Sequence, residues 1–185
     1  KIPFLCAIPA KDRGRGAPFP VAIYGHGYGS ARFEMIGFAG NIARYGIATC
    51  VIDAYGHGLV IPKDAEEIAD SVFGAYKARG LKNALVPGRA RDLDNDGVPD
   101  SGGDFFTADL FHTRDTVRQS VLDQMVLVRA LRACDGTRRA LQDYKRSGTK
   151  NIACDFDGDG IPDLGGFKND YFTWGQSLGG ILSST

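Results

Sequence analysis

The stretch at 171–180, near the end of this 185-residue chain, constrains its fold more than any other. A short β-prone run, Tyr171 to Trp174, leads into Gly-Gln-Ser-Leu-Gly at 175–179, and a helix is expected to begin at Leu178. A G-x-S-x-G segment between a strand and a helix predicts a sharp turn that holds the serine backbone under strain. Glycines flank the serine because side chains there would collide with the neighbouring strand or helix. The pattern alone is weak in a chain with 25 glycines, so its context decides its meaning.

Two glycine-rich turns upstream supply that context. A buried-strand pattern at 20–25 runs into His-Gly-Tyr-Gly at 26–29, and an apolar strand at 47–53 ends in Asp-Ala-Tyr-Gly-His-Gly at 53–58. With the serine turn, these motifs resemble the α/β-hydrolases in order and spacing. The segment Arg-Asp-Thr-Val-Arg-Gln-Ser from Arg114 is similar to one found in bacterial extracellular lipases and esterases.

The resemblance implies an α/β fold with an α/β-hydrolase core, a mostly parallel sheet flanked by helices, of which this chain carries the N-terminal portion. Residues 1–58 and 105–185 are expected to form the core. Residues 59–104 are expected to be a cap insertion, although a surface elaboration without substrate contact is the alternative. Within the core, the pattern predicts an antiparallel strand at 2–8 and helices at 32–45 and 113–133. Ile36 is expected on the inner face of the first helix and Leu122 on that of the second. A further amphipathic helix is expected at 63–79, with Ile68, Val72 and Tyr76 on one stripe, and a short one at 138–145.

The same resemblance assigns roles in an ester-cleaving site. Ser177 corresponds to the nucleophile, and the backbone N–H groups of Tyr28 and Leu178 to the donors of an oxyanion hole. Residues that shape the two turns are His26, Gly27 and Gly29 in the first, and Gly175, Gln176 and Gly179 in the second. His26 and His57 are expected to shape turns, because the family's catalytic histidine follows the serine and none follows Ser177. A base and an acid are therefore expected from sequence beyond Thr185, in the same or a second polypeptide.

Two nine-residue segments, 92–100 and 155–163, share the pattern D-x-D-x-D-G-x-P-D. Carboxylates at positions 1, 3 and 5 around a glycine turn can converge on one hard cation, and the carbonyl at position 7 adds an oxygen. The pattern resembles the first half of EF-hand loops and, in its Pro-Asp ending, the calcium repeats of thrombospondin type 3. An Asp- and Gly-rich solvated turn is the alternative. We expect two structural calcium ions, with ligands Asp92, Asp94, Asp96, Val98, Asp100, Asp155, Asp157, Asp159, Ile161 and Asp163.

The cysteines and the charge balance bound the location and the partners. Cys134 and Cys154 both adjoin an aspartate and are expected to form a disulfide, whereas Cys6 and Cys50 could pair or remain free thiols. A disulfide and millimolar calcium both indicate an extracellular or cell-surface protein. Lys+Arg and Asp+Glu both number 22, which gives no sign of nucleic acid as a partner. No apolar run approaches the roughly 18 residues that span a bilayer.

These inferences favour a serine hydrolase that acts on small-molecule or lipid esters. A peptidase or an acyltransferase would use the same residues, so the sequence does not separate these activities. From a different class, the chain could be a calcium-stabilised surface or adhesion module on an inactive scaffold. A complete serine turn argues against that reading, because a strained turn has no evident use in a scaffold.

Overall fold

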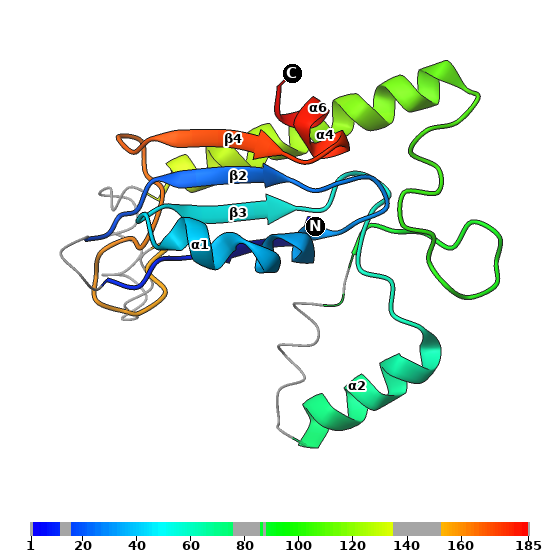
Figure 1. The fold of residues 1–185 in the computed structure, drawn as a ribbon, viewed down its shortest axis with the longest axis horizontal. Coiled ribbons are helices and arrows are strands. Elements are labelled where there is room, and N and C mark those ends of the chain that lie inside the picture. The colour runs from blue at the N-terminus through cyan, green and yellow to red at the C-terminus, as the bar shows by residue number, and fades with distance from the viewer. Residues whose placement is uncertain (1, 12–15, 76–85, 87, 135–152, 185) are drawn as a thin grey trace, which may run out of the picture.

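The computed structural model describes residues 2–11, 16–75, 86, 88–134 and 153–184. Its centre is a small mixed sheet of four described strands in the order β1-β3-β2-β4 (Figure 1). The strands are β1 (Phe4–Ala7), β2 (Val21–Gly25), β3 (Ala48–Ile52) and β4 (Tyr171–Gly175). β3 and β4 each pair with β2 in parallel, and β1 pairs with β3 antiparallel. The carboxyl ends of the three parallel strands therefore meet at one edge of the sheet.

The two central strands are buried along their whole length, and their side chains alternate between two cores. On one face, Ile23 and Cys50 pack against Leu127 and Leu131. On the other face, Tyr24 and Val51 pack against residues that include Met35 and Ala39. A strand covered on both faces reads as a continuous apolar run, which explains the composition of both segments.

Short helices follow the strands, and one long helix crosses a face of the sheet. After β2 come a 3₁₀ helix, η1 (Arg32–Gly37), and α1 (Ala39–Ala43). α2 (Lys63–Ala75) lies apart from the sheet in Figure 1, and α4 (Leu110–Arg132) packs on the sheet through its C-terminal half. α6 (Leu178–Ser183) begins directly after β4. Among the described residues, no helix combines the length and hydrophobicity that crossing a bilayer requires.

The expected fold class is wrong. The described sheet is small and mixed, with one antiparallel strand and few helices, and it is not a typical α/β-hydrolase core. The motifs that suggested the family lie at strand ends, where they specify single strand–turn–helix junctions. Such junctions do not determine how many strands a sheet contains or how its faces are covered. The division into a core and a cap insertion stays a prediction.

Several helix predictions also need correction. The helix expected at 32–45 is divided into η1 and α1, and Ile36, expected inside, is 66% exposed while Arg32 is buried. In α4 the expected inward residue Leu122 is 53% exposed. The stripe on α2 faces solvent at Ile68 and Val72. Tyr76 and the helix expected at 138–145 lie outside the described residues.

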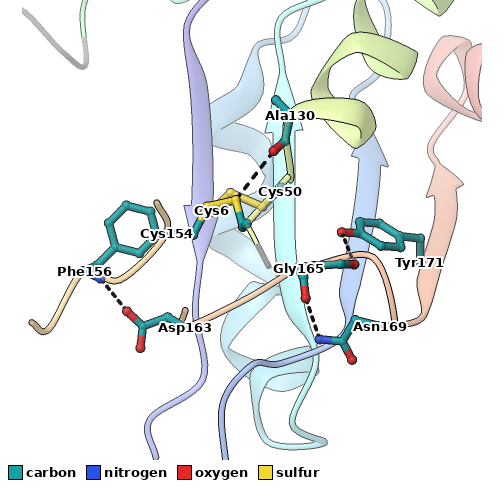
Figure 2. The surroundings of a disulfide bond; sticks show 11 residues. Cys6, Cys50, Ala130, Cys154, Phe156, Asp163, Gly165, Asn169 and Tyr171 are labelled. Atoms are coloured by element: carbon teal, nitrogen blue, oxygen red, sulfur yellow. Dashed lines mark hydrogen bonds between the residues drawn. A yellow bond between two sulfur atoms is a disulfide. The ribbon is translucent and has the colours of Figure 1, made fainter. Parts of the chain in front are cut away.

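Two disulfides are present. The expected Cys134–Cys154 bridge is confirmed, and Cys6 pairs with Cys50 across β1 and β3, where the two residues stand opposite each other in the antiparallel register. Figure 2 shows this neighbourhood, with the segment from Cys154 to Asn169 running beside the sheet toward β4. There the Asn169 amide donates to Gly165 O at 2.9 Å, which fixes the bend that precedes β4. The Cys6–Cys50 bridge thus lies in the middle of the β1–β3 pair.

Candidate active site

Ser177 lies at the junction of β4 and α6, in the strand–turn–helix arrangement that the sequence predicts. Its backbone has φ 52° and ψ −117°, a positive φ that costs a non-glycine residue about 1–3 kcal/mol. The side chain is exposed and its hydroxyl makes no hydrogen bond within the described residues. A strained turn therefore presents an unengaged hydroxyl to solvent.

Close backbone packing explains the glycines around Ser177. A Cβ added to Gly179 would stand 1.9 Å from Gly25 O, and one added to Gly175 would stand 2.3 Å from the carbonyl carbon of Gly179. Since β2 and β4 pair through Gly25 and Gly175, the turn after β2 and the turn after β4 leave the sheet side by side. The collision predicted for side chains at these positions is thus confirmed.

Hydrogen bonds hold the turn after β2 on several sides. Gly27 O accepts from Ser30 N at 3.1 Å, and it also accepts from His26 Nδ1 at 2.8 Å. The Tyr28 hydroxyl donates to Gly102 O at 3.0 Å, and the Ser101 hydroxyl donates to Ser30 O at 3.3 Å. These bonds connect the turn to the segment around Gly102, which belongs to the predicted insertion.

The backbone N–H groups of the two turns differ in whether they are hydrogen-bonded. The amides of Gly27, Ser30, Gln176, Gly179 and Gly180 all donate within the structure. By contrast, the amides of Tyr28, Gly29, Ser177 and Leu178 donate to no group in the described part of the chain. Because a trans peptide points its N–H opposite its C=O, the anchored Gly27 carbonyl directs the Tyr28 N–H to the other side. The oxyanion-hole role expected of the Tyr28 and Leu178 amides stays a prediction.

None of the three histidines contacts Ser177. His26 Nε2 accepts from Ala54 N at 2.9 Å, so its Nδ1 carries the proton that reaches Gly27 O. His57 Nδ1 lies 2.8 Å from Tyr55 O and His112 Nε2 lies 2.8 Å from Asp104 O, so each ring donates to a backbone carbonyl. Burial lowers the pKa of both His26 and His57, which keeps these rings neutral. Their geometry fits residues that shape turns.

A buried ion pair anchors the turn after β3. Asp53 accepts from the Arg32 backbone N at 2.7 Å and pairs with the Arg32 guanidinium, and both side chains are almost completely buried. Arg89 donates to Asp53 O at 3.0 Å and pairs with Asp123 on α4 at 2.7 Å. Breaking a buried pair leaves an uncompensated charge, so these contacts tie η1, β3 and α4 firmly together. No sequence pattern pointed to Arg32 or Arg89.

The two Asp-rich loops have nearly the same internal hydrogen bonds. Position 6 donates to position 1, at 2.8 Å from Gly97 to Asp92 and at 2.9 Å from Gly160 to Asp155. Position 2 likewise donates to position 9 in both loops. Carboxylate oxygens converge within 4.8 Å of one another in two clusters, Asp92, Asp94 and Asp100 in the first loop, and Asp155, Asp157 and Asp159 in the second. Asp96 and Asp163 lie outside the clusters.

One feature separates the loops. Lys11 Nζ lies 2.8 Å from Asp157, 2.7 Å from Asp159 and 2.8 Å from Asp163. Its hydrogen bonds to these carboxylates, that to Asp157 first, raise the pKa of Lys11 above its ordinary value. The first loop has no lysine or arginine paired with its aspartates among the described residues. An ammonium group thus lies among the carboxylates of the second loop.

No family model, no curated protein and no solved structure matches this chain.

Proposed function

We propose that this protein is a serine hydrolase that cleaves carboxylic esters through an acyl-enzyme, with Ser177 as the nucleophile. The observation that carries the proposal is the exposed Ser177 on a strained turn, which lies next to the glycine-rich turn after β2. The amides of Tyr28 and Leu178 in these two turns have no partner among the described residues. A turn that only connected β4 to α6 would not need a strained, non-glycine residue with its side chain exposed.

In this mechanism Ser177 Oγ attacks the ester carbonyl and its proton passes to a histidine. The tetrahedral oxyanion accepts hydrogen bonds from Tyr28 N–H and Leu178 N–H, each worth about 3 kcal/mol. Collapse of the intermediate expels the alcohol, and water then hydrolyses the acyl-serine. His26, His57 and His112 are not assigned this role, because each ring is already hydrogen-bonded to a backbone carbonyl.

The substrate class is a small-molecule or lipid ester. Exposed apolar residues near the turn after β2 support this class: Tyr28 and Phe106 are each 50% exposed, with ring centroids 5.5 Å apart. An apolar surface beside the nucleophile would bind an acyl or alcohol group by burying its hydrocarbon. A peptidase would use the same catalytic groups, so hydrolysis of esters and of peptides is compared in the same preparation.

Two structural calcium ions belong to the proposal. Each acidic cluster offers three carboxylates that fit a hard cation of six to eight oxygen ligands, with the Val98 and Ile161 carbonyls as further ligands. The Lys11 ammonium among the carboxylates of the second loop supports the view that this loop favours a cation. Calcium would neutralise the loops, and it takes no part in the ester chemistry.

An extracellular or cell-surface location completes the proposal. Two disulfides in one chain are typical of oxidising compartments. Loops that hold calcium with few ligands need its millimolar concentration, which is found outside cells.

The test of the nucleophile uses the complete natural polypeptide. A fluorophosphonate probe is expected to label Ser177, and Ser177→Ala is expected to abolish both labelling and p-nitrophenyl ester cleavage. Ser184→Ala is the matched control, because Ser184 is exposed about two turns further along and bonds only to nearby carbonyls. Full activity in Ser177→Ala would sink the mechanism and favour the scaffold alternative. Residues 1–185 alone are expected to be inert, since none of the three histidines contacts Ser177.

A further inference from the structure

Glu34 is a partly buried carboxylate beside the turn after β2, and no sequence motif marks it. It lies on η1, the 3₁₀ helix that follows this turn. Glu34 Oε2 accepts from Gly27 N at 3.0 Å, and Glu34 Oε1 accepts from the Tyr24 hydroxyl at 2.6 Å. The Ser30 hydroxyl also hydrogen-bonds to this carboxylate. One side chain therefore holds the beginning, the middle and the end of the turn.

These contacts determine the orientation of the peptide that carries the Tyr28 N–H. Glu34 fixes the amide of Gly27, while His26 and Ser30 fix its carbonyl. With both polar groups of Gly27 held, the following peptide plane has one orientation, because a trans peptide is planar. Without the Glu34 bond, the amide of a glycine could rotate at little steric cost, since glycine is the most permissive residue.

Glu34 also borders the serine turn. A Cβ added to Gly27 would stand 2.3 Å from Gln176 Oε1 and 3.8 Å from Glu34 Oε2. The ring of Tyr24, whose hydroxyl bonds Glu34, lies 4.6 Å from the ring of Trp174 on β4. The carboxylate is thus linked through Gly27 to the turn after β2, and through Tyr24 to the strand that precedes Ser177.

We propose that Glu34 is a positioning residue for ester cleavage, which acts through Gly27 to aim the Tyr28 N–H at the substrate oxyanion. The proposal rests on the proposed function. Glu34 does not touch the substrate, so its loss misaligns one of two donors and leaves Ser177 in place. The effect therefore falls on the transition state, where the oxyanion forms, and not on ground-state binding.

The charged form of Glu34 is the one that this role needs. Burial acts to raise the pKa of Glu34, but hydrogen bonds from Tyr24, Gly27 and Ser30 outweigh it and hold the pKa below its ordinary value. An ionised acceptor makes stronger bonds to N–H and O–H donors than a neutral one. Glutamine at position 34 keeps one carbonyl oxygen that can accept from Gly27 N–H, whereas alanine keeps none. Glu34→Gln is therefore expected to weaken this hydrogen bond, and Glu34→Ala to remove it.

The experiment measures steady-state ester hydrolysis by the complete polypeptide. Glu34→Ala is expected to lower kcat about tenfold with KM unchanged, less than the 10²–10³ that loss of a whole oxyanion donor costs. Glu34→Gln is expected to recover part of that loss. The control is Glu67→Gln, which replaces an exposed carboxylate on α2 with a carboxamide and is expected to keep wild-type kcat. Wild-type kcat in Glu34→Ala, or a change confined to KM, would overturn the proposal.

A second measurement separates this proposal from the proposed function. In ¹⁵N-labelled protein the Gly27 amide resonance is expected to shift on acid titration, with an apparent pKa below that of an ordinary glutamate, and to lose this titration in Glu34→Gln. If the wild type neither reacts with the fluorophosphonate nor cleaves esters, the proposed function fails whatever Glu34 does. If the titration of the Gly27 resonance is the same in Glu34→Gln as in the wild type, Glu34 does not hold the Gly27 amide and the proposal is wrong. Where Glu34→Ala does not fold, Glu34→Gln carries the kinetic test.

Discussion

The loops at 92–100 and 155–163 have the same local structure but different surroundings. In both, position 9 donates its amide at 2.7 Å to the residue before position 1, Arg91 in the first loop and Cys154 in the second. The first loop belongs to the segment between β3 and α4, and its paired residue Arg91 is an exposed arginine. The second loop precedes β4, its neighbour Cys154 is in a disulfide, and Lys11 reaches three of its aspartates.

The comparison shows that one local sequence pattern gives one backbone, while distant residues decide how strongly it is held. Asx-type hydrogen bonds within nine residues suffice to form each loop. The disulfide and the lysine attach only the second loop to the remainder of the fold. We infer that the second loop stabilises the approach to β4, and that the first responds more directly to calcium.

Breaking the disulfide is expected to have the largest effect. Cys154→Ser opens a bridge between residues 20 positions apart in sequence, which the chain-entropy model values at about 3 kcal/mol. Arg91→Ser changes the equivalent position of the first loop, where the half-exposed Arg91 pairs with Asp104 and no disulfide is present. An ion pair with one such exposed partner is expected to contribute about 1 kcal/mol. Urea unfolding of the two variants under non-reducing conditions measures the difference. Equal losses would contradict the idea that attachment distinguishes the loops.

An intermediate effect is expected from removing one carboxylate at position 5 of each loop. Asp159→Ala is expected to lower the melting temperature more than Asp96→Ala, because Asp159 belongs to an acidic cluster and pairs with Lys11, whereas Asp96 does neither. The scans are run in millimolar calcium and again in EDTA. If calcium binds only the folded protein, chelation lowers the melting temperature of the wild type by mass action. If EDTA does not change the melting temperature of the wild type, the two loops are polar turns and not calcium sites.

The serine turn and the two glycine-rich turns were predictable from sequence because their geometry is local. Ser177 and its flanking glycines sit within five residues, and each glycine is required by a backbone contact that any fold with this junction would make. The same holds for the Asp-rich loops, whose hydrogen bonds join residues no more than nine positions apart. The Cys134–Cys154 pairing followed from two similar positions on either side of one segment.

The residues that sequence reasoning missed act over longer distances. Lys11 meets Asp159 across 148 positions, and nothing in the pattern at Lys11 points there. Glu34 falls in the helix expected at 32–45, whose apolar pattern predicted that Ile36 faces the core. Ile36 is exposed instead, and nothing in that pattern indicated a role for Glu34. Arg32 was unexpected because a buried arginine is recognisable only together with Asp53. The fold class failed for a related reason, since local junctions carry no information on the number and direction of strands.

Replacing Lys11 is expected to have the smallest effect and the most specific one. Lys11→Met keeps most of the apolar stem and removes the charge that competes with calcium for Asp157 and Asp159. Calcium affinity of the second loop is expected to rise about fivefold, which corresponds to the upper end of exposed ion-pair energies. Calorimetric titration with calcium measures the affinity. The control is Lys168→Met, which removes the same charge from an exposed position. An unchanged affinity would mean that Lys11 and calcium do not share a position.

The pH dependence of stability gives the same replacement a second readout. The pKa of Asp157 lies below its ordinary value, and the largest cause is the hydrogen bond that Lys11 donates to it. A depressed folded-state pKa contributes stability that is present above the unfolded value, about 3.9, and is lost as pH falls through the folded value. In calcium-free buffer the wild type is therefore expected to lose melting temperature below about pH 4, and Lys11→Met to lose less over that window. If the melting temperatures of the wild type and Lys11→Met fall equally below about pH 4, the Lys11 ammonium does not stabilise the second loop.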